Sequence, residues 1–301
     1  MAFNWQIFKT RTITAAIFAI IMLAGLLINH WTFFILFSVI HFGCWLEYQK
    51  LVGLIDKEYQ KISSFHKYGV MIAGWCIMLY FTNDSYNIFG FTLHELGWWT
   101  GLTFLFVLPI IELLFAPNIQ LKNIGYSAFG LVYISLSWGL MMDLRQNFFV
   151  NDDPHDELPK WLSLIIPLTI SFSLWINDTM AYIVGSIIGK TVLSRISPKK
   201  TVEGTIGGII LSVIVVALLI TKGSSLSTSP GRLPHMWWVI IPAITAIVGT
   251  FGDLLESKLK RIAKVKDSGN LMPGHGGFLD RFDSMLLAIP AVWLYVYFFI
   301  R

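Results

Sequence analysis

Charged side chains gather in one short segment near the C-terminal end of a largely apolar chain. Residues 266–283 read KDSGNLMPGHGGFLDRFD. The charged residues of this segment are Lys266, Asp267, Asp280, Arg281 and Asp283. Carboxylate oxygens are the ligands that hard divalent cations such as Mg²⁺ prefer, and Lys and Arg neutralise phosphate oxygens. The intervening glycines let the backbone bend sharply and approach a ligand closely. The segment therefore has the composition of a site for a metal ion and a phosphate group.

The same segment holds one histidine, His275. It could serve as a hydrogen-bond donor to a phosphate, a metal ligand or a structural hydrogen-bond partner, and the sequence does not choose among these roles. The order of residues along the chain suggests neither a Ser–His–Asp triad nor a zinc site.

A second charged group stands directly before an apolar run, in SPKKTVEGTIGG, residues 197–208. Thr201 is a suitable N-cap for a helix that has Glu203 in its first turn. Lys199 and Lys200 beside the positive end of that helix would make a polyphosphate site at a membrane surface. Contact of an ordinary basic loop with anionic lipid explains the same residues equally well.

An acidic residue also lies within an apolar run, in WINDTMAYIVGSIIGK, residues 175–190. On a helix, one face carries Asp178, Tyr182, Gly185 and Gly189. An ionisable group at membrane depth indicates a functional site, because placing it there is energetically costly. The alternative is a structural hydrogen bond between helices that pack through their glycines.

The segment GTFGDLLESKLKR, residues 249–261, predicts a polar stripe on a helix. The stripe consists of Asp253, Glu256, Ser257 and Lys260. Two carboxylates and a hydroxyl at this spacing can bind a divalent cation. The plain end of a helix in contact with water is the alternative.

Composition places these groups in an all-α polytopic integral membrane protein. Only 13% of the 301 residues are charged, against about 25% in soluble domains. Apolar runs long enough to cross the bilayer predict about nine transmembrane helices, at residues 12–29, 31–46, 68–82, 98–115, 124–142, 161–189, 205–221, 237–256 and 284–300. The run at 161–189 is long for one span, so it is expected to be tilted, broken or continued beyond the membrane.

Charge in the predicted loops orients the protein. A cytoplasmic N-terminus and an outside C-terminus put most of the 22 Lys and Arg residues on the cytoplasmic side, as the positive-inside rule requires. Residues 1–160 are then N-terminal transmembrane helices with few polar residues. Residues 161–301 form a catalytic transmembrane core with cytoplasmic loops at 190–204 and 257–283.

The segment SKLKRIAKVKDSGNLMPGHGGFLDRFD, residues 257–283, resembles the signature of the phosphatidate cytidylyltransferase family, also called CDP-diacylglycerol synthases. All elements of that signature are present in order, and the likeness extends over roughly residues 170–285. The resemblance implies Mg²⁺-dependent transfer of a cytidylyl group from CTP to phosphatidic acid, giving CDP-diacylglycerol and pyrophosphate. Two-metal chemistry allows a second cation in the same site.

The resemblance implies that Asp253 and Asp267 are the metal ligands. The roles of the other residues are inferred from their chemistry. Asp280 and Asp283 would complete the metal site or orient Arg281 and Lys266. The expected groups around the nucleotide are Ser197, Lys199, Lys200, Thr201, Glu203 and Asp178. Lys266 and Arg281 would neutralise the leaving pyrophosphate or the lipid phosphate.

Two other functions remain open at this point. A CTP-dependent polyprenol or lipid kinase would attack the γ-phosphorus instead, and an ion-coupled transporter would use the intramembrane acids as an ion path. The expected partners are CTP, phosphatidic acid and the lipid bilayer, with no nucleic acid. The expected location is the cell (inner) membrane, with the site facing the cytoplasm, and the resemblance suggests a homodimer.

Overall fold

The computed structural model describes residues 5–115, 120–146, 162–223, 236–270 and 276–300. His275 lies outside these residues. The chain divides into two compact units, one made of residues 1–152 and 259–282 and the other of residues 153–258 and 283–301. The functional division at residue 160 stays a prediction.

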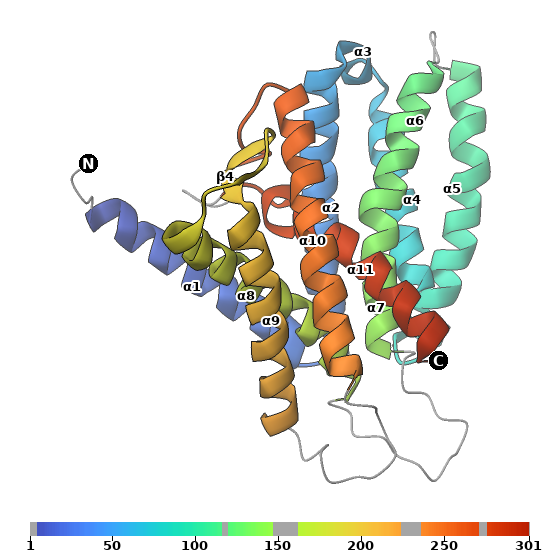
Figure 1. The fold of residues 1–301 in the computed structure, drawn as a ribbon. Helices are drawn as coiled ribbons and strands as arrows, with labels where there is room; N and C mark the ends of the chain where they lie inside the picture. Colours follow the sequence, from blue (N-terminus) through green and yellow to red (C-terminus); the bar gives the residue numbers. More distant parts are fainter. Residues whose placement is uncertain (1–4, 116–119, 147–161, 224–235, 271–275, 301) are drawn as a thin grey trace, which may run out of the picture. The chain divides into compact units, whose positions relative to one another are not determined.

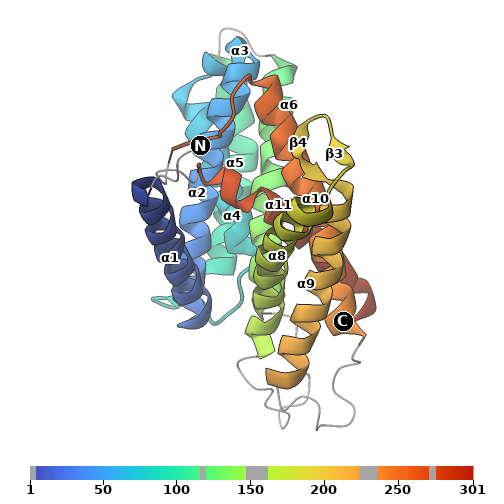
Figure 2. The ribbon, with the colours of Figure 1, turned by 60° about the vertical axis from the view of Figure 1, so that its left-hand side comes forward.

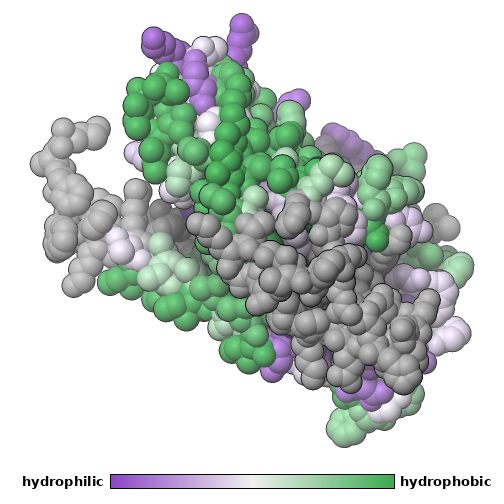
Figure 3. Space-filling model, turned by 60° about the horizontal axis from the view of Figure 1, so that its bottom comes forward, coloured by the Kyte–Doolittle hydropathy of each residue, from purple (hydrophilic) through white to green (hydrophobic). Residues whose placement is uncertain are grey.

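The described residues confirm the all-α class. Seven of their helices are long and apolar enough to cross a membrane, and a shorter apolar helical segment covers Thr12–Leu27. In the view of Figure 3, hydrophobic residues cover broad areas of the described surface, as expected where side chains face lipid. The chain is therefore a multi-pass membrane protein. The count of nine spans and the orientation stay predictions.

The first unit begins with the helices labelled α1 to α5 in Figure 1 and a short hairpin between α4 and α5. These elements are α1 (Trp5–Leu27), α2 (His30–Ile55), α3 (Lys57–Gln60), α4 (Ser64–Tyr80), β1 (Asn87–Ile88), β2 (Phe91–Thr92) and α5 (Leu93–Phe115). Asn29 starts α2 with a capping box, because its side chain accepts from the Thr32 N–H while Thr32 bonds back to Asn29. Strands β1 and β2 pair in antiparallel fashion.

One further span completes the N-terminal part of this unit. It runs through α6 (Leu121–Gly130), the π-helical segment η1 (Leu131–Leu136) and α7 (Ser137–Gln146). Helix α4 packs against α5 and against this span, as Figures 1 and 2 show. Trp45, His41 and Ser135 form a buried polar contact across the bundle, in which the Trp45 indole N–H donates to Ser135 Oγ at 2.8 Å.

The second unit is built on two closely packed helices, α8 (Leu162–Ile188) and α9 (Val202–Gly223). Glycines make their approach possible, since a Cβ atom at Gly204 would lie 2.6 Å from the Ala181 carbonyl oxygen. The run predicted at 161–189 is one continuous helix that contains Pro167. An antiparallel hairpin joins the two helices through β3 (Val192–Ser194) and β4 (Ser197–Thr201), so the predicted loop 190–204 is largely regular structure.

Helices α10 (Trp237–Ile262) and α11 (Leu279–Phe299) contribute residues to both units. In the second unit, Gly252 allows α10 to lie against the first turns of α11, because a Cβ atom there would be 2.6 Å from the Asp283 carbonyl oxygen. Both helices extend into the predicted loop 257–283, which shortens the connection to residues 263–278.

Candidate active site

A polar pocket of about 410 Å³ lies in the second unit, between α8, the β3–β4 hairpin, α9 and α10. We call it the lysine–aspartate pocket and define it by Asp178, Lys199, Lys200, Thr201 and Asp253, which all line it. The structure thus brings together five of the residues predicted from three separate sequence segments. Asn177, Tyr182 and Thr250 also line the pocket.

An ion pair joins two elements across this pocket. Lys200 Nζ on β4 lies 2.6 Å from Asp253 Oδ2 on α10. Burial would lower the pKa of Lys200, but the charges of Asp253, Asp178 and Asp283 outweigh burial and raise that pKa above its ordinary value. Lys200 is therefore held as a cation in the pocket, where it can neutralise a phosphate.

Further acidic side chains surround the pair. Asp283, at the start of α11, interacts electrostatically with Asp253, Glu256 and Asp178. Glu256 is fully buried and Asp283 is 6% exposed. Carboxyl groups gathered out of water in this way stay charged only where cations lie near them, because their mutual repulsion is poorly screened there.

Carboxylate oxygens are the donors that a hard divalent cation takes, so these side chains match the family resemblance in their chemistry. Asp253, Glu256 and Asp283 are the residues that would hold such a cation. Within the described part of the chain, no three His, Cys, Asp or Glu side chains are spaced as a ready-made metal site. Asp267 belongs to the other unit, so the predicted pairing of Asp253 with Asp267 as joint ligands stays a prediction.

Thr201 and Glu203 build the hairpin and the start of α9. The Gly204 N–H donates to Thr201 Oγ1 at 3.1 Å, which confirms Thr201 as the N-cap of α9. The Glu203 carboxylate accepts from the N–H groups of Lys190 and Thr191 at 3.1 Å and thereby closes the base of the hairpin. Ser197 pairs with Ser194 in the β3–β4 hairpin. Glu203 and Ser197 lie outside the set that lines the pocket.

The signature segment forms a second polar cluster, in the first unit. Glu47 of α2 accepts from the N–H groups of Phe278 and Leu279, both at 2.9 Å, and so caps the start of α11. Ser268 Oγ lies 2.7 Å from Glu47 Oε2 and 2.9 Å from Asp280 Oδ2. We call Glu47, Ser268 and Asp280 the signature clamp, because they tie the segment before α11 to α2.

Asp280 completes the clamp. It accepts from the N–H groups of Ser268 and Gly277 at 2.8 Å and forms an ion pair with Lys260 Nζ at 2.6 Å. Gly276 has a φ of 83°, and a Cβ atom there would lie 2.6 Å from Asp280 Oδ2. Only glycine suits this position, for reasons of both conformation and space. Three further predicted residues, Lys266, Asp267 and Arg281, have exposed side chains in this unit.

Sequence reasoning missed Glu47. The predicted apolar run ended at residue 46 and left Glu47 in a loop, whereas α2 continues to Ile55. A longer helix would have shown a carboxylate within a membrane span, which is the same signal that identified Asp178.

Comparison with known proteins identifies the class. The model of the cytidylyltransferase family matches residues 9–299, and the chain therefore belongs to that family of enzymes.

Curated relatives carry the name phosphatidate cytidylyltransferase. The protein of Staphylococcus saprophyticus is 29% identical over 285 residues, which cover 94% of this chain and 96% of the relative. That of Haemophilus influenzae is 30% identical over 221 residues, covering 69% and 68%. The Bacillus subtilis protein is 32% identical over 190 residues, which are 61% of this chain and 64% of that protein.

Proposed function

We propose that the chain is a CTP:phosphatidate cytidylyltransferase that produces CDP-diacylglycerol and pyrophosphate. One observation carries this proposal: Lys200, held as a cation, pairs with Asp253 in a pocket that Asp178 and Lys199 also line, in a membrane protein of the cytidylyltransferase family. The relatives' name supplies the two substrates. Such a pocket suits a nucleoside triphosphate that is bound together with a divalent cation.

The proposed reaction needs no general base. A phosphate monoester has a second pKa of about 6, so the lipid phosphate is already an anion at neutral pH. One of its oxygens forms a bond to the α-phosphorus of CTP while the bond to the β-phosphate oxygen breaks, and pyrophosphate leaves with that electron pair. The protein has to neutralise charge and align the two substrates.

Named residues would meet these needs. Lys199 and Lys200 would bind the triphosphate, with Thr201 and Asp178 at the wall of the same pocket. Mg²⁺, when bound by the acidic side chains, would supply further positive charge against the phosphates. Lys266 and Arg281 would neutralise the pyrophosphate or the lipid phosphate, and Asp267 would be a further metal ligand. The signature clamp would keep these three residues in place.

The cellular setting is part of the proposal. The relatives compared above are bacterial, which supports an inner-membrane location. The basic loops favour a site that faces the cytoplasm, where CTP is available. A homodimer and a second cation stay predictions.

Isotope position distinguishes the candidate reactions. Purified protein in detergent would receive Mg²⁺, phosphatidic acid and CTP labelled at either the α- or the γ-phosphorus. We expect the α-label to enter the lipid fraction and the γ-label to appear in pyrophosphate. Transfer of the γ-label to a lipid alcohol would instead establish a kinase. No transfer of either label, from protein that still binds CTP, would contradict both reactions and favour transport.

A further inference from the structure

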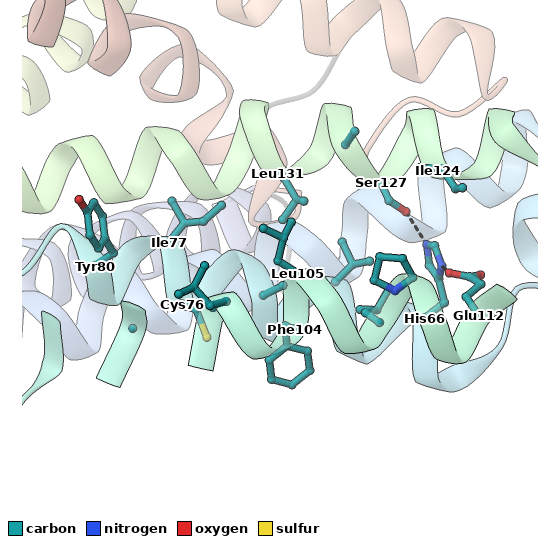
Figure 4. A pocket seen from close by; sticks show the side chains of 18 of the residues that line it. His66, Cys76, Ile77, Tyr80, Phe104, Leu105, Glu112, Ile124, Ser127 and Leu131 are labelled. Atoms are coloured by element: carbon teal, nitrogen blue, oxygen red, sulfur yellow. Dashed lines mark hydrogen bonds and ion pairs between the residues drawn. The ribbon is translucent and has the colours of Figure 1, made fainter. Parts of the chain in front are cut away.

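The first unit contains a second cavity, of about 470 Å³, which is lined by α4, α5 and the span from α6 into η1 and is open on one side. We call it the apolar cavity. Figure 4 shows that aliphatic and aromatic side chains line most of it, while His66, Glu112 and Ser127 gather at one end. Tyr80 lies at the opposite end in the same view.

Hydrogen bonds at the polar end have a defined direction. His66 Nδ1 contacts Glu112 Oε2, so Nδ1 carries the proton that the carboxylate accepts. His66 Nε2 lies 2.7 Å from Ser127 Oγ, and Ser127 Oγ lies 3.2 Å from the Tyr59 hydroxyl. With a neutral imidazole, Tyr59 donates to Ser127 and Ser127 donates to His66. The chain of donors ends on Glu112, which leaves its other carboxylate oxygen to accept from a ligand.

The cavity is long and narrow enough for one hydrocarbon chain. Its lining runs along α4 from His66 to Tyr80, which is about 21 Å at 1.5 Å of rise per residue. One leaflet of the hydrocarbon core is only about 15 Å thick, so a lipid chain that spans one leaflet is shorter than this lining. A single extended chain lying along α4 would therefore bury most of its length among the apolar side chains.

Charge restricts the head group. Glu112 is 14% exposed at the side chain, and none of the described residues that line the cavity is Lys or Arg. An anionic phosphate or carboxylate would be repelled there, and a hydroxyl would find an acceptor. We propose that the apolar cavity is a binding site for a neutral lipid with one long chain and a hydroxyl head group, of the monoacylglycerol type. This ligand differs from phosphatidic acid in both its charge and its number of chains.

Photocrosslinking tests the proposal directly. A monoacylglycerol with a diazirine at the end of its chain would be added to the full-length protein in zwitterionic bilayers, and the adducts would be mapped by mass spectrometry. We expect adducts near Tyr80 and Trp98, which line the cavity far from Glu112 along the helices. Gly101→Phe should remove them, because the new side chain extends from a cavity-lining position past Cys76.

A charge-matched pair of variants tests the head-group selectivity. In the unaltered protein, monoacylglycerol should displace the probe about tenfold better than the fatty acid anion of equal chain length, the size of effect given by one hydrogen bond to a charged group. Glu112→Gln should reduce this preference to about twofold or less. Glu95→Gln, which changes an exposed carboxylate on the same helix, should preserve it.

Two results would overturn the proposal. One is a set of adducts spread over the lipid-facing surface that Gly101→Phe leaves unchanged. The other is equal competition by the fatty acid anion in the unaltered protein. If Gly101→Phe does not fold, the Glu112→Gln comparison decides alone, since that change preserves the shape of the side chain.

Discussion

Two cavities of similar volume, about 410 and 470 Å³, have opposite linings. In the lysine–aspartate pocket, α8, β4 and α10 bring two acids and two lysines together, and Lys200 pairs with Asp253. In the apolar cavity, the polar groups at one end form a directed chain of hydrogen bonds that leaves one Glu112 carboxylate oxygen for a ligand. The charged lining of the first cavity suits ionic ligands, whereas the lining of the second suits an apolar chain. Volume alone would not have distinguished these functions.

The comparison predicts the largest effect for the carboxylates proposed to bind metal. Asp253→Asn and Asp267→Asn should each lower kcat about a thousandfold or more, because charge stabilisation at the reacting phosphate is lost. The α-labelled CTP assay measures this effect, and a thermal-shift assay checks folding. Near-normal turnover in either variant would contradict that residue's assignment as a metal ligand.

Removing the cation from the same pocket should have the next largest effect. Lys200→Met keeps the length of the side chain but removes its charge, so kcat/KM for CTP should fall about a hundredfold. Lys190→Met serves as the control, since Lys190 is an exposed residue that precedes the hairpin in the same unit. Equal losses in both variants would indicate a general effect of surface charge on CTP attraction.

The signature clamp should act on turnover through position. Glu47→Ala leaves the Phe278 and Leu279 N–H groups without their acceptor, which should destabilise the protein by about 1–3 kcal/mol. If the segment then moves, kcat should fall about tenfold while KM for CTP changes little. Glu47→Gln retains an acceptor oxygen and should recover part of this loss. A Glu47→Ala enzyme that loses stability but retains full kcat would show that the clamp is only structural.

The Lys200–Asp253 ion pair predicts a smaller effect, on stability against pH. The pKa of Lys200 is raised in the folded protein, so the pair contributes fully below the ordinary lysine pKa. That contribution is lost as the pH rises through the raised value. The thermal unfolding temperature of the unaltered protein should therefore fall more steeply above about pH 10.5 than that of Lys200→Met. Parallel declines would show that the pair adds no net stability.

The smallest effect on turnover should come from the apolar cavity. Glu112→Gln should change kcat/KM for CTP and phosphatidic acid by less than about twofold, because Glu112 neutralises no phosphate in the proposed reaction. The labelled CTP assay measures this as well. A loss of tenfold or more would end the contrast between the two cavities by linking both to catalysis.

Sequence patterns predicted some parts of the site well. Thr201 was identified as a helix cap from its place before an apolar run, and the structure confirms it. Glu203 was expected in the first turn of the same helix, and it lies in the first turn of α9. Predictions of this kind succeed because a cap or a first turn depends only on neighbouring residues.

Other parts depended on contacts between distant segments. The β3–β4 hairpin was missed because its strands are short and SPKKT lacks the apolar alternation of a strand. The polar network of His66, Glu112 and Ser127 was missed because residues 1–160 read as plain membrane helices. Each of these three residues, taken alone, is more often a simple packing or surface residue.

By itself, the sequence determined that the chain is an all-α membrane protein, that its charged segments adjoin membrane spans, and that it carries a cytidylyltransferase signature. Apolar runs, caps and signature residues are local properties, which hold whatever the helices pack against. Only the tertiary structure decided that Lys200 pairs with Asp253, and that Glu47 holds a segment more than 200 positions later in the chain. Such pairs form because buried charges and N–H groups must find partners, and helix packing alone determines which partners lie within reach.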